Sequence, residues 1–200
     1  MTLYDIKPKF QTLLRPSVTK LATRGITANQ VTVFAALGSV VLGAILLRWS
    51  THTWLFVLVP IWMFARMALN AMDGMLAREF NQKSHLGQFL NELCDVVSDW
   101  ALIAPFLLIA PFTPLTVALV MLLAALSEMT GVIAQASGAS RRYDGPLGKS
   151  DRALLLSIIA LWLVIAGQLP EWAYWIMPIT IVLLMVTVVN RVRRAIAEIK

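Results

Sequence analysis

The chain has 200 residues, of which 58% are apolar and only 14% are charged. Soluble domains carry about 25% charged residues, so this composition excludes an ordinary soluble domain and indicates a membrane protein. The net charge of +6 does not indicate a nucleic-acid partner, because the basic residues lie in short loops between long apolar runs. The single cysteine, Cys94, excludes an internal disulfide, and the length suits one domain over residues 1–200.

Residues 1–26 alternate apolar and basic positions, and Pro8 and Pro16 are expected to divide them into short pieces. We predict an amphipathic juxtamembrane segment that lies on the anionic cytoplasmic leaflet of the membrane. The alternative is a disordered basic tail. Because this region is polar and basic, we expect no cleavable signal peptide.

Six apolar runs follow, and each is near the roughly 20 residues that cross the hydrocarbon layer of a bilayer. Thr27 and Gln30 predict a capping box that opens the first of these helices. The predicted helices span about residues 31–47, 54–76, 87–110, 115–136, 152–167 and 172–189. The predicted fold class is therefore an all-α integral membrane protein with a six-helix bundle over residues 31–190.

The basic residues also predict the orientation of the bundle. They precede the first predicted helix and follow the second, fourth and sixth, whereas the loops near Thr51, Pro111 and Pro170 contain no Lys or Arg. Only Arg48 lies at a helix end on that side. By the positive-inside rule, both termini of this multi-pass cell-membrane protein are cytoplasmic.

One stretch carries acidic and amide side chains at helical spacing within otherwise apolar sequence. Asn70 and Asp73 are three residues apart near the end of the second predicted helix. Asn91, Asp95 and Asp99 follow at four-residue intervals, so they form one stripe on the third helix, with steps of about 6 Å. Two facing helices with these stripes would gather oxygen ligands for a hard divalent cation at the cytoplasmic ends of both helices.

Small and basic residues accompany these ligands. Gly74 and Ala77 leave room for a phosphate beside the backbone, and Arg78 closes the segment. The matched positions of the motif are Asp73, Gly74, Ala77, Arg78, Gly87 and Asp95. Their spacing resembles the signature of the CDP-alcohol phosphatidyltransferases, D-x-x-D-G-x-x-A-R-x(8)-G-x-x-x-D-x-x-x-D.

The sequence departs from that signature at two positions. Asn70 and Asn91 stand where the family has its first and third aspartates, and Asp99 is an additional carboxylate one turn beyond the last family position. An amide oxygen can bind Mg²⁺ but contributes no charge. The two amides remove two negative charges from the predicted metal site, and Asp99 could restore one of them.

The resemblance implies a membrane phosphotransferase of phospholipid biosynthesis. The donor would be a CDP-linked lipid such as CDP-diacylglycerol, an acceptor alcohol would attack its phosphorus, and CMP would leave. Because the family's aspartates hold two divalent ions, the resemblance implies one or two Mg²⁺ or Mn²⁺ ions in this chain. The metal-ligand candidates are Asn70, Asp73, Asn91, Asp95 and Asp99.

The resemblance also implies roles for individual residues. Asp95 takes the position of the catalytic base, with Asp99 as its rival. Lys149 and Arg152 lie in a region that resembles the family's binding site for a phosphate on the acceptor alcohol. Family members are usually homodimers. The candidates for binding CDP and its phosphates are Asp73, Gly74, Ala77, Arg78 and Gly87.

Other functions stay open at this point. The two amides are compatible with a CDP-lipid binder that has no catalytic activity. The polar residues could instead form a buried network that fixes helix packing. A small transporter could use Asp95, Asp99 and Glu128 as an intramembrane relay, but a relay needs ionisable residues throughout the bilayer, whereas most of these cluster near one face.

The arginines outside the motif could bind a ligand or have a structural role. Arg66 could contact a substrate phosphate, or pair with an intramembrane acid such as Glu128 or Glu92. Arg141, Arg142 and the arginines near the C-terminus are expected to be ordinary positive-inside charges that need no ligand.

Overall fold

The computed structural model describes residues 3–199, and the side chains from residue 10 onward. This part of the chain is helical with connecting loops and contains no strand. The α-helices are α1 (Leu3–Thr23), α2 (Ala28–Arg48), α3 (Leu58–Glu79), α4 (His85–Ile103), α5 (Pro114–Ala136), α6 (Lys149–Ala166) and α7 (Ile176–Ile199). Short 3-10 helices, η1 (Thr53–Val57), η2 (Ala104–Leu108) and η3 (Glu171–Trp175), adjoin α3, α4 and α7.

Each of the six predicted runs corresponds to one helix from α2 to α7. Within residues 3–199, four segments are long and apolar enough to cross a membrane: Ala28–Arg48, Thr53–Glu79, Pro114–Ala136 and Glu171–Ile199. Helices α4 and α6 are shorter, and each carries three charged residues, Glu92, Asp95 and Asp99 in α4 and Lys149, Asp151 and Arg152 in α6. The predicted capping box at the start of α2 is confirmed, because Thr27 and Gln30 bond to each other's backbone N–H groups.

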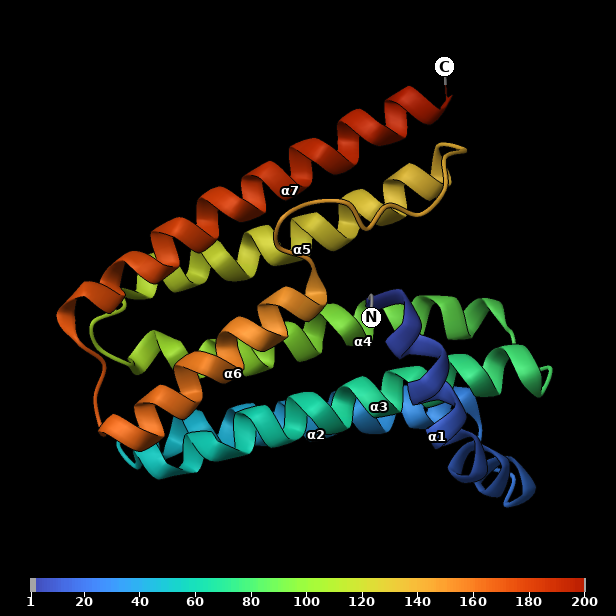
Figure 1. The fold of residues 1–200 in the computed structure, drawn as a ribbon, viewed down its shortest axis with the longest axis horizontal. Coiled ribbons are helices and arrows are strands. Elements are labelled where there is room, and N and C mark those ends of the chain that lie inside the picture. Colours follow the sequence, from blue (N-terminus) through green and yellow to red (C-terminus); the bar gives the residue numbers. More distant parts are fainter. Residues whose placement is uncertain (1–2, 200) are drawn as a thin grey trace.

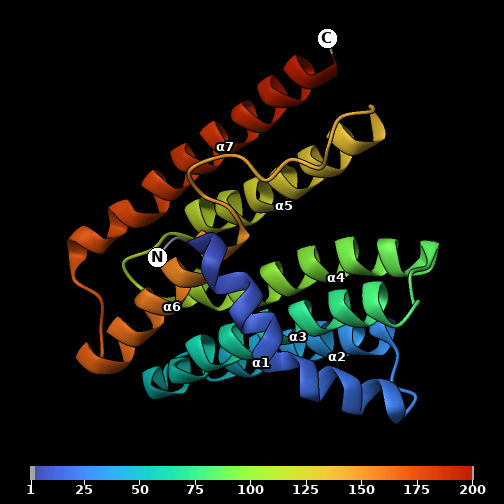
Figure 2. The same cartoon turned by 45° about the vertical axis from the view of Figure 1, so that its right-hand side comes forward.

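Helix α1 continues through Pro8 and Pro16, so the prediction that these prolines divide it was wrong. Figure 2 shows that the helix bends rather than ends. A proline inside a helix removes one hydrogen bond, and packing can hold the kinked helix together. Here Val18 is fully buried against Met75 and other apolar residues of α2 and α3.

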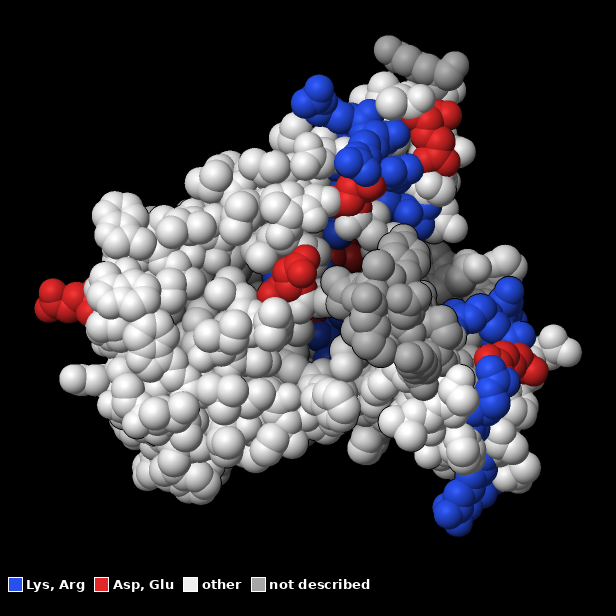
Figure 3. All heavy atoms as spheres, viewed as in Figure 1, with Lys and Arg blue, Asp and Glu red and all other residues white. Residues whose placement is uncertain are grey.

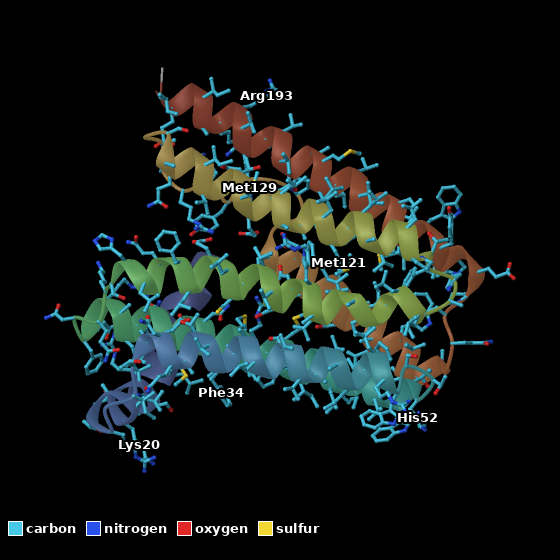
Figure 4. The ribbon with its side chains drawn as sticks, turned by 180° about the vertical axis from the view of Figure 1, so that it is seen from behind. Lys20, Phe34, His52, Met121, Met129 and Arg193 are labelled. Carbon is cyan, nitrogen blue, oxygen red and sulfur yellow. The ribbon has the colours of Figure 1, made fainter. Side chains whose placement is uncertain are left out.

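The helices fall into two groups. Helices α5 and α7 lie along each other, and α2, α3, α4 and α6 form the second group (Figure 1). The loops 24–27 and 80–84 and the end of α5 lie at one end of the molecule, which we call the basic end (Figure 1). Figure 4 places Lys20 and Arg193 toward this end and His52 at the opposite end. Most of the charged surface in Figure 3 also lies toward the basic end, and the opposite half is almost uniformly uncharged.

Residues 137–148 form a strap that returns from the end of α5 along the bundle, so that α6 begins near the middle of the molecule (Figure 1). Helix α6 was predicted to begin after Asp151, but it begins at Lys149. The reason is a cap, because the Asp151 carboxylate accepts a hydrogen bond of 2.8 Å from the Gly148 N–H. This early start brings Lys149 and Arg152 beside α4.

Candidate active site

The polar stripes of α3 and α4 face each other, as their spacing predicts. The guanidinium of Arg66 on α3 bonds to Asp99 at 2.7 Å and to Asp95 at 3.2 Å. One turn further along α3, the Asn70 amide donates to Asp95 over 3.4 Å. The predicted alternatives for Arg66 named Glu128 or Glu92 as its acidic partner, but its partners are the two aspartates of α4.

Asp73 lies one turn beyond Asn70 on α3 and is 5% exposed. Its Oδ2 atom accepts a hydrogen bond of 2.7 Å from the Thr32 hydroxyl on α2. Thr32 was not predicted as a site residue. Its hydroxyl lies one turn after the start of α2 at Ala28, and this position in the sequence could have indicated it. The bond orients the Asp73 carboxylate.

Asp95 lies between α3 and α6 at the centre of the site. Its Oδ1 atom receives the contacts from Arg66, Asn70 and the ammonium group of Lys149. All three contacts fall on the same carboxylate oxygen. The Asp95 side chain is 19% exposed, so it is more accessible than Asp99 on the next turn.

Asp99 has both oxygens occupied. Arg66 donates to Oδ1 and Arg152 donates to Oδ2, each over 2.7 Å. Both arginines are almost fully buried. In this arrangement the Asp99 carboxylate is a counter-ion for two guanidinium groups.

Arg78 is the exposed cation on the α3 side of the site. A Cβ atom at Gly74 would lie 3.0 Å from an Arg78 nitrogen, so the guanidinium folds back over the space that glycine leaves. Within residues 10–199, Arg78 has no ion pair or side-chain hydrogen bond. Ala77 is half-buried beside it. Among the described side chains, Arg78 is therefore an uncommitted cation close to the motif glycine.

The start of α4 packs closely against the start of α2. A Cβ atom at Gly87 would lie 2.8 Å from the side-chain oxygen of Asn29. The Gly87 N–H donates to the Ser84 hydroxyl, which caps α4. Asn91 follows one turn later and is half-buried. Gly87 thus allows the approach of two helices.

Four charged residues of this region were not predicted as part of the site, namely Glu92, Glu128, Arg141 and Arg191. Glu128 on α5 bonds to Arg152 at 3.2 Å and lies 3.6 Å from Arg191 of α7. Arg141 of the strap makes a double hydrogen bond to Glu92. The expectation that Arg141 and Arg191 are ordinary positive-inside charges was wrong, because Arg191 is 1% exposed and Arg141 is paired inside the protein.

The donor set was tested against the divalent cation that the family implies. Asp73 and Asp95 are carboxylates on facing helices, and Asn70 and Asn91 add amide oxygens, which is the ligand chemistry of Mg²⁺ or Mn²⁺. Within the described residues, no three His, Cys, Asp or Glu side chains are grouped closely enough to hold a metal by themselves. The donor types therefore suit a hard cation, and a substrate would have to supply further ligands.

A family model of the CDP-alcohol phosphatidyltransferases matches residues 25–189, and the chain belongs to this family. It is therefore a membrane protein of a transferase family that typically uses divalent metal ions. Inner membrane protein YnbA of Escherichia coli (strain K12) is 46% identical over 196 residues, which is 96% of each chain. A phosphatidylinositol phosphate synthase of Mycobacteroides abscessus is 27% identical over 190 residues, 91% of this chain and 83% of that protein. The predicted resemblance is confirmed.

Proposed function

We propose that the protein transfers a substituted phosphate from a CDP-linked lipid such as CDP-diacylglycerol to an alcohol, and releases CMP. The observation that carries this proposal is the pair of facing helices on which Asp73 and Asp95 lie beside the uncommitted Arg78. Carboxylates on one side and a free cation on the other suit a pyrophosphate ligand. Family membership supports the same reaction class.

The pyrophosphate would lie along α3. The small residues Gly74 and Ala77 allow the phosphates to approach the backbone, and Arg78 would bind a phosphate oxygen. Gly87 lets α4 begin close to α2, which fixes the opposite wall. Because Arg78 has a fork of N–H donors, it would also stabilise the charge that develops on the CMP leaving group.

Asp95 is the proposed base for the acceptor hydroxyl. Three donors hold its Oδ1 atom, so the carboxylate is oriented. Lys149 lies next to it and is the partly exposed candidate for contact with the acceptor. Asp99 and Arg152 are proposed as positioning residues, since they are buried and bound to each other.

A divalent ion, Mg²⁺ or Mn²⁺, would be held by Asp73, Asp95 and the amide oxygens of Asn70 and Asn91. When bound, such an ion neutralises phosphate charge and polarises the phosphoryl oxygens. A second ion would depend on substrate phosphates, because both oxygens of Asp99 are taken by arginines.

The membrane arrangement is part of the proposal. We propose that α2–α7 all cross the bilayer of the inner membrane, with both termini and the site on the cytoplasmic side and α1 at the cytoplasmic surface. The charged residues of α4 and α6 pair with each other and with neighbouring helices, which lowers the cost of placing them within a membrane. A homodimer is proposed from the family alone.

Asn70 and Asn91 favour a second candidate, a protein that binds CDP-lipids without transferring them. Two amides in place of aspartates weaken the attraction of the site for a metal ion. The transporter alternative has no comparable support, because the buried acids are paired with arginines near one region and do not form a path between the two ends.

The test is CMP release from CDP-diacylglycerol by the purified protein, with Mg²⁺ or Mn²⁺ and a panel of acceptor alcohols. Asp73→Ala and Asp95→Ala are compared with Glu171→Ala, which lies in η3 at the end away from the site. Metal-dependent release that is lost in the first two variants and kept in the third supports the transferase. Metal-dependent binding of CDP-diacylglycerol without CMP release supports the binder, and absence of both contradicts the two proposals.

A further inference from the structure

Four arginines next to the proposed acceptor position form a buried cluster with three acids, which we call the arginine network. It consists of Arg66, Arg141, Arg152 and Arg191 with Glu92, Asp99 and Glu128. The network joins α3, α4, α5, the strap, α6 and α7. Figure 3 shows charged atoms inside a recess beside α6, in the region where these elements meet.

Glu128 is the acid on which three of these arginines converge. Its carboxylate lies 3.2 Å from Arg152, 3.6 Å from Arg191 and 3.7 Å from Arg141. Glu128 itself is buried. A carboxylate in this position occupies the place where several guanidinium groups would otherwise hold an anion from outside.

The terminal nitrogens of the network are used within the chain, whereas the Nε atoms of Arg66, Arg141 and Arg152 are buried without a hydrogen-bond partner among the described residues. Arg66 and Arg141 direct both terminal nitrogens to acceptors of α4. Arg152 donates to Asp99 and Glu128 through one terminal nitrogen and lies 3.4 Å from the Ser127 hydroxyl through the other. A phosphate group would have to displace these acceptors to be bound.

The charges lead to the same result. The four guanidinium groups face three carboxylates, and Lys149 with Asp95 adds one charge of each sign, so the excess is a single positive charge. A phosphate monoester brings about −1.5 to −2 charges at neutral pH. Such a ligand would leave the site with uncompensated negative charge in a poorly solvated region.

We infer that the acceptor is an uncharged alcohol and not a phosphorylated one. This inference rests on the proposed transferase function. A neutral hydroxyl needs only an oriented base and a few hydrogen bonds, which Asp95 and the partly exposed Lys149 supply. The arginine network then positions α4 and α6 around Asp95, and Glu128 excludes acceptors that carry a phosphate.

The experiment compares matched acceptors with CDP-diacylglycerol as donor and Mg²⁺ or Mn²⁺ present. Glycerol is paired with glycerol 3-phosphate, and inositol with inositol 1-phosphate. We expect the better neutral alcohol to stimulate CMP release at least tenfold more than either phosphorylated alcohol. A preference for a phosphorylated acceptor overturns the inference and leaves the transferase proposal intact.

Binding gives a readout that does not require turnover. We expect the phosphorylated alcohols, up to 10 mM, to leave the thermal unfolding temperature of the wild-type protein unchanged. If no acceptor stimulates CMP release, the proposed function fails. The binding measurement then still tests whether the site excludes phosphorylated alcohols. Stabilisation by glycerol 3-phosphate or inositol 1-phosphate, but not by their neutral counterparts, overturns it.

Glu128→Gln tests the role assigned to the carboxylate, with Glu171→Gln as the same substitution at the opposite end. Removing the Glu128 charge should raise the selectivity for a phosphorylated alcohol over its neutral counterpart about tenfold, measured as CMP release or as binding. Glu171→Gln should leave this selectivity unchanged. Glu128→Asp keeps the charge and should keep the wild-type selectivity. A folded Glu128→Gln protein with wild-type selectivity contradicts the inference, and if that variant does not fold, the wild-type comparison decides.

Discussion

Three aspartates in one short stretch have different surroundings, although their sequence contexts look alike. Asp73 accepts a hydrogen bond from Thr32, Asp95 is partly exposed beside Lys149, and Asp99 is enclosed by two arginines. A carboxylate between two buried guanidinium groups has no oxygen left for a metal or an acceptor. The residue that could have replaced a missing family ligand is therefore proposed as a structural counter-ion.

Asp99→Asn should destabilise the fold far more than the loss of an exposed ion pair. The change leaves Arg66 and Arg152 without their shared counter-ion, and breaking a buried pair costs about 3–5 kcal/mol. The control is Glu79→Gln, which removes the exposed partner of Arg15 and should cost about 0–1 kcal/mol. Unfolding of both variants in one detergent is the measurement, and equal losses would contradict the counter-ion role.

Asn70→Asp should strengthen metal binding. The substitution restores the first carboxylate of the family pattern beside Asp95, and affinity for hard cations rises with the number of charged ligands. We expect the Mg²⁺ or Mn²⁺ concentration that half-saturates a thermal stabilisation to fall about tenfold. Gln82→Glu adds the same charge in the loop before α4 and is the control for general electrostatic attraction, so an equal effect there would argue against a site at Asn70.

At the scale of elements, the strap is held to α7 by a small group of charged residues. Arg142 donates to Asp144 and also pairs with Glu198 of α7, and Arg194 of α7 donates to the other Asp144 oxygen. Ser140 bonds to Glu198 through both its N–H and its hydroxyl. These contacts fix the strap, and through it the position at which α6 begins.

The strap should loosen in acid. The hydrogen bond from Arg142, with a further contribution from Arg194, holds the pKa of Asp144 below its ordinary value. The stabilisation is therefore complete above the unfolded-state pKa of about 3.9 and is lost as the pH falls through the lowered native pKa. The unfolding temperature of the wild type minus that of Asp144→Asn should be constant from pH 7 to about 5 and should shrink below about 4. A difference that does not change with pH would contradict this role.

At the scale of the whole molecule, charge is separated along the bundle. The basic loops lie at one end, and the opposite end, where Figure 4 places His52, is almost uniformly uncharged (Figure 3). The segments η1, which follows His52, and η3 carry the mostly exposed side chains of Trp54 and Trp172. Aromatic residues of this kind are typical of membrane interfaces. The site lies in the half of the molecule toward the basic loops.

The proposed orientation can be tested by labelling single cysteines in a Cys94→Ala background. Lys83→Cys lies in the exposed loop between α3 and α4, and Thr51→Cys lies in the exposed loop between α2 and η1. A membrane-impermeant maleimide should label Thr51→Cys in intact spheroplasts and Lys83→Cys only in inverted vesicles. The opposite pattern would contradict a cytoplasmic site, and labelling of both from one side would contradict an odd number of crossings between them.

The sequence by itself determined the helical class, the positions of the helices and the family. Apolar runs, the Thr27–Gln30 capping box and the spacing from Asp73 to Asp95 are local patterns, and local patterns are read directly from the order of residues. The helical spacing of Asn70 and Asp73 against Asn91 and Asp95 also predicted that two stripes would meet. The sequence could not show that α1 stays continuous through its prolines, because packing against α3 decides this.

Only the tertiary structure decided the partner of each charge. Arg191, Glu128 and Arg141 are far apart in the sequence, and the positive-inside rule explains the arginines without a partner. Arg191 lies on the buried face of α7 with Thr180, Leu184 and Thr187. Their helical spacing in the sequence is a pattern that could have indicated the burial of Arg191. Ion pairs between distant helices depend on how the helices pack and how the strap returns, and this is why the roles of Asp99 and Glu128 emerge only from the folded chain.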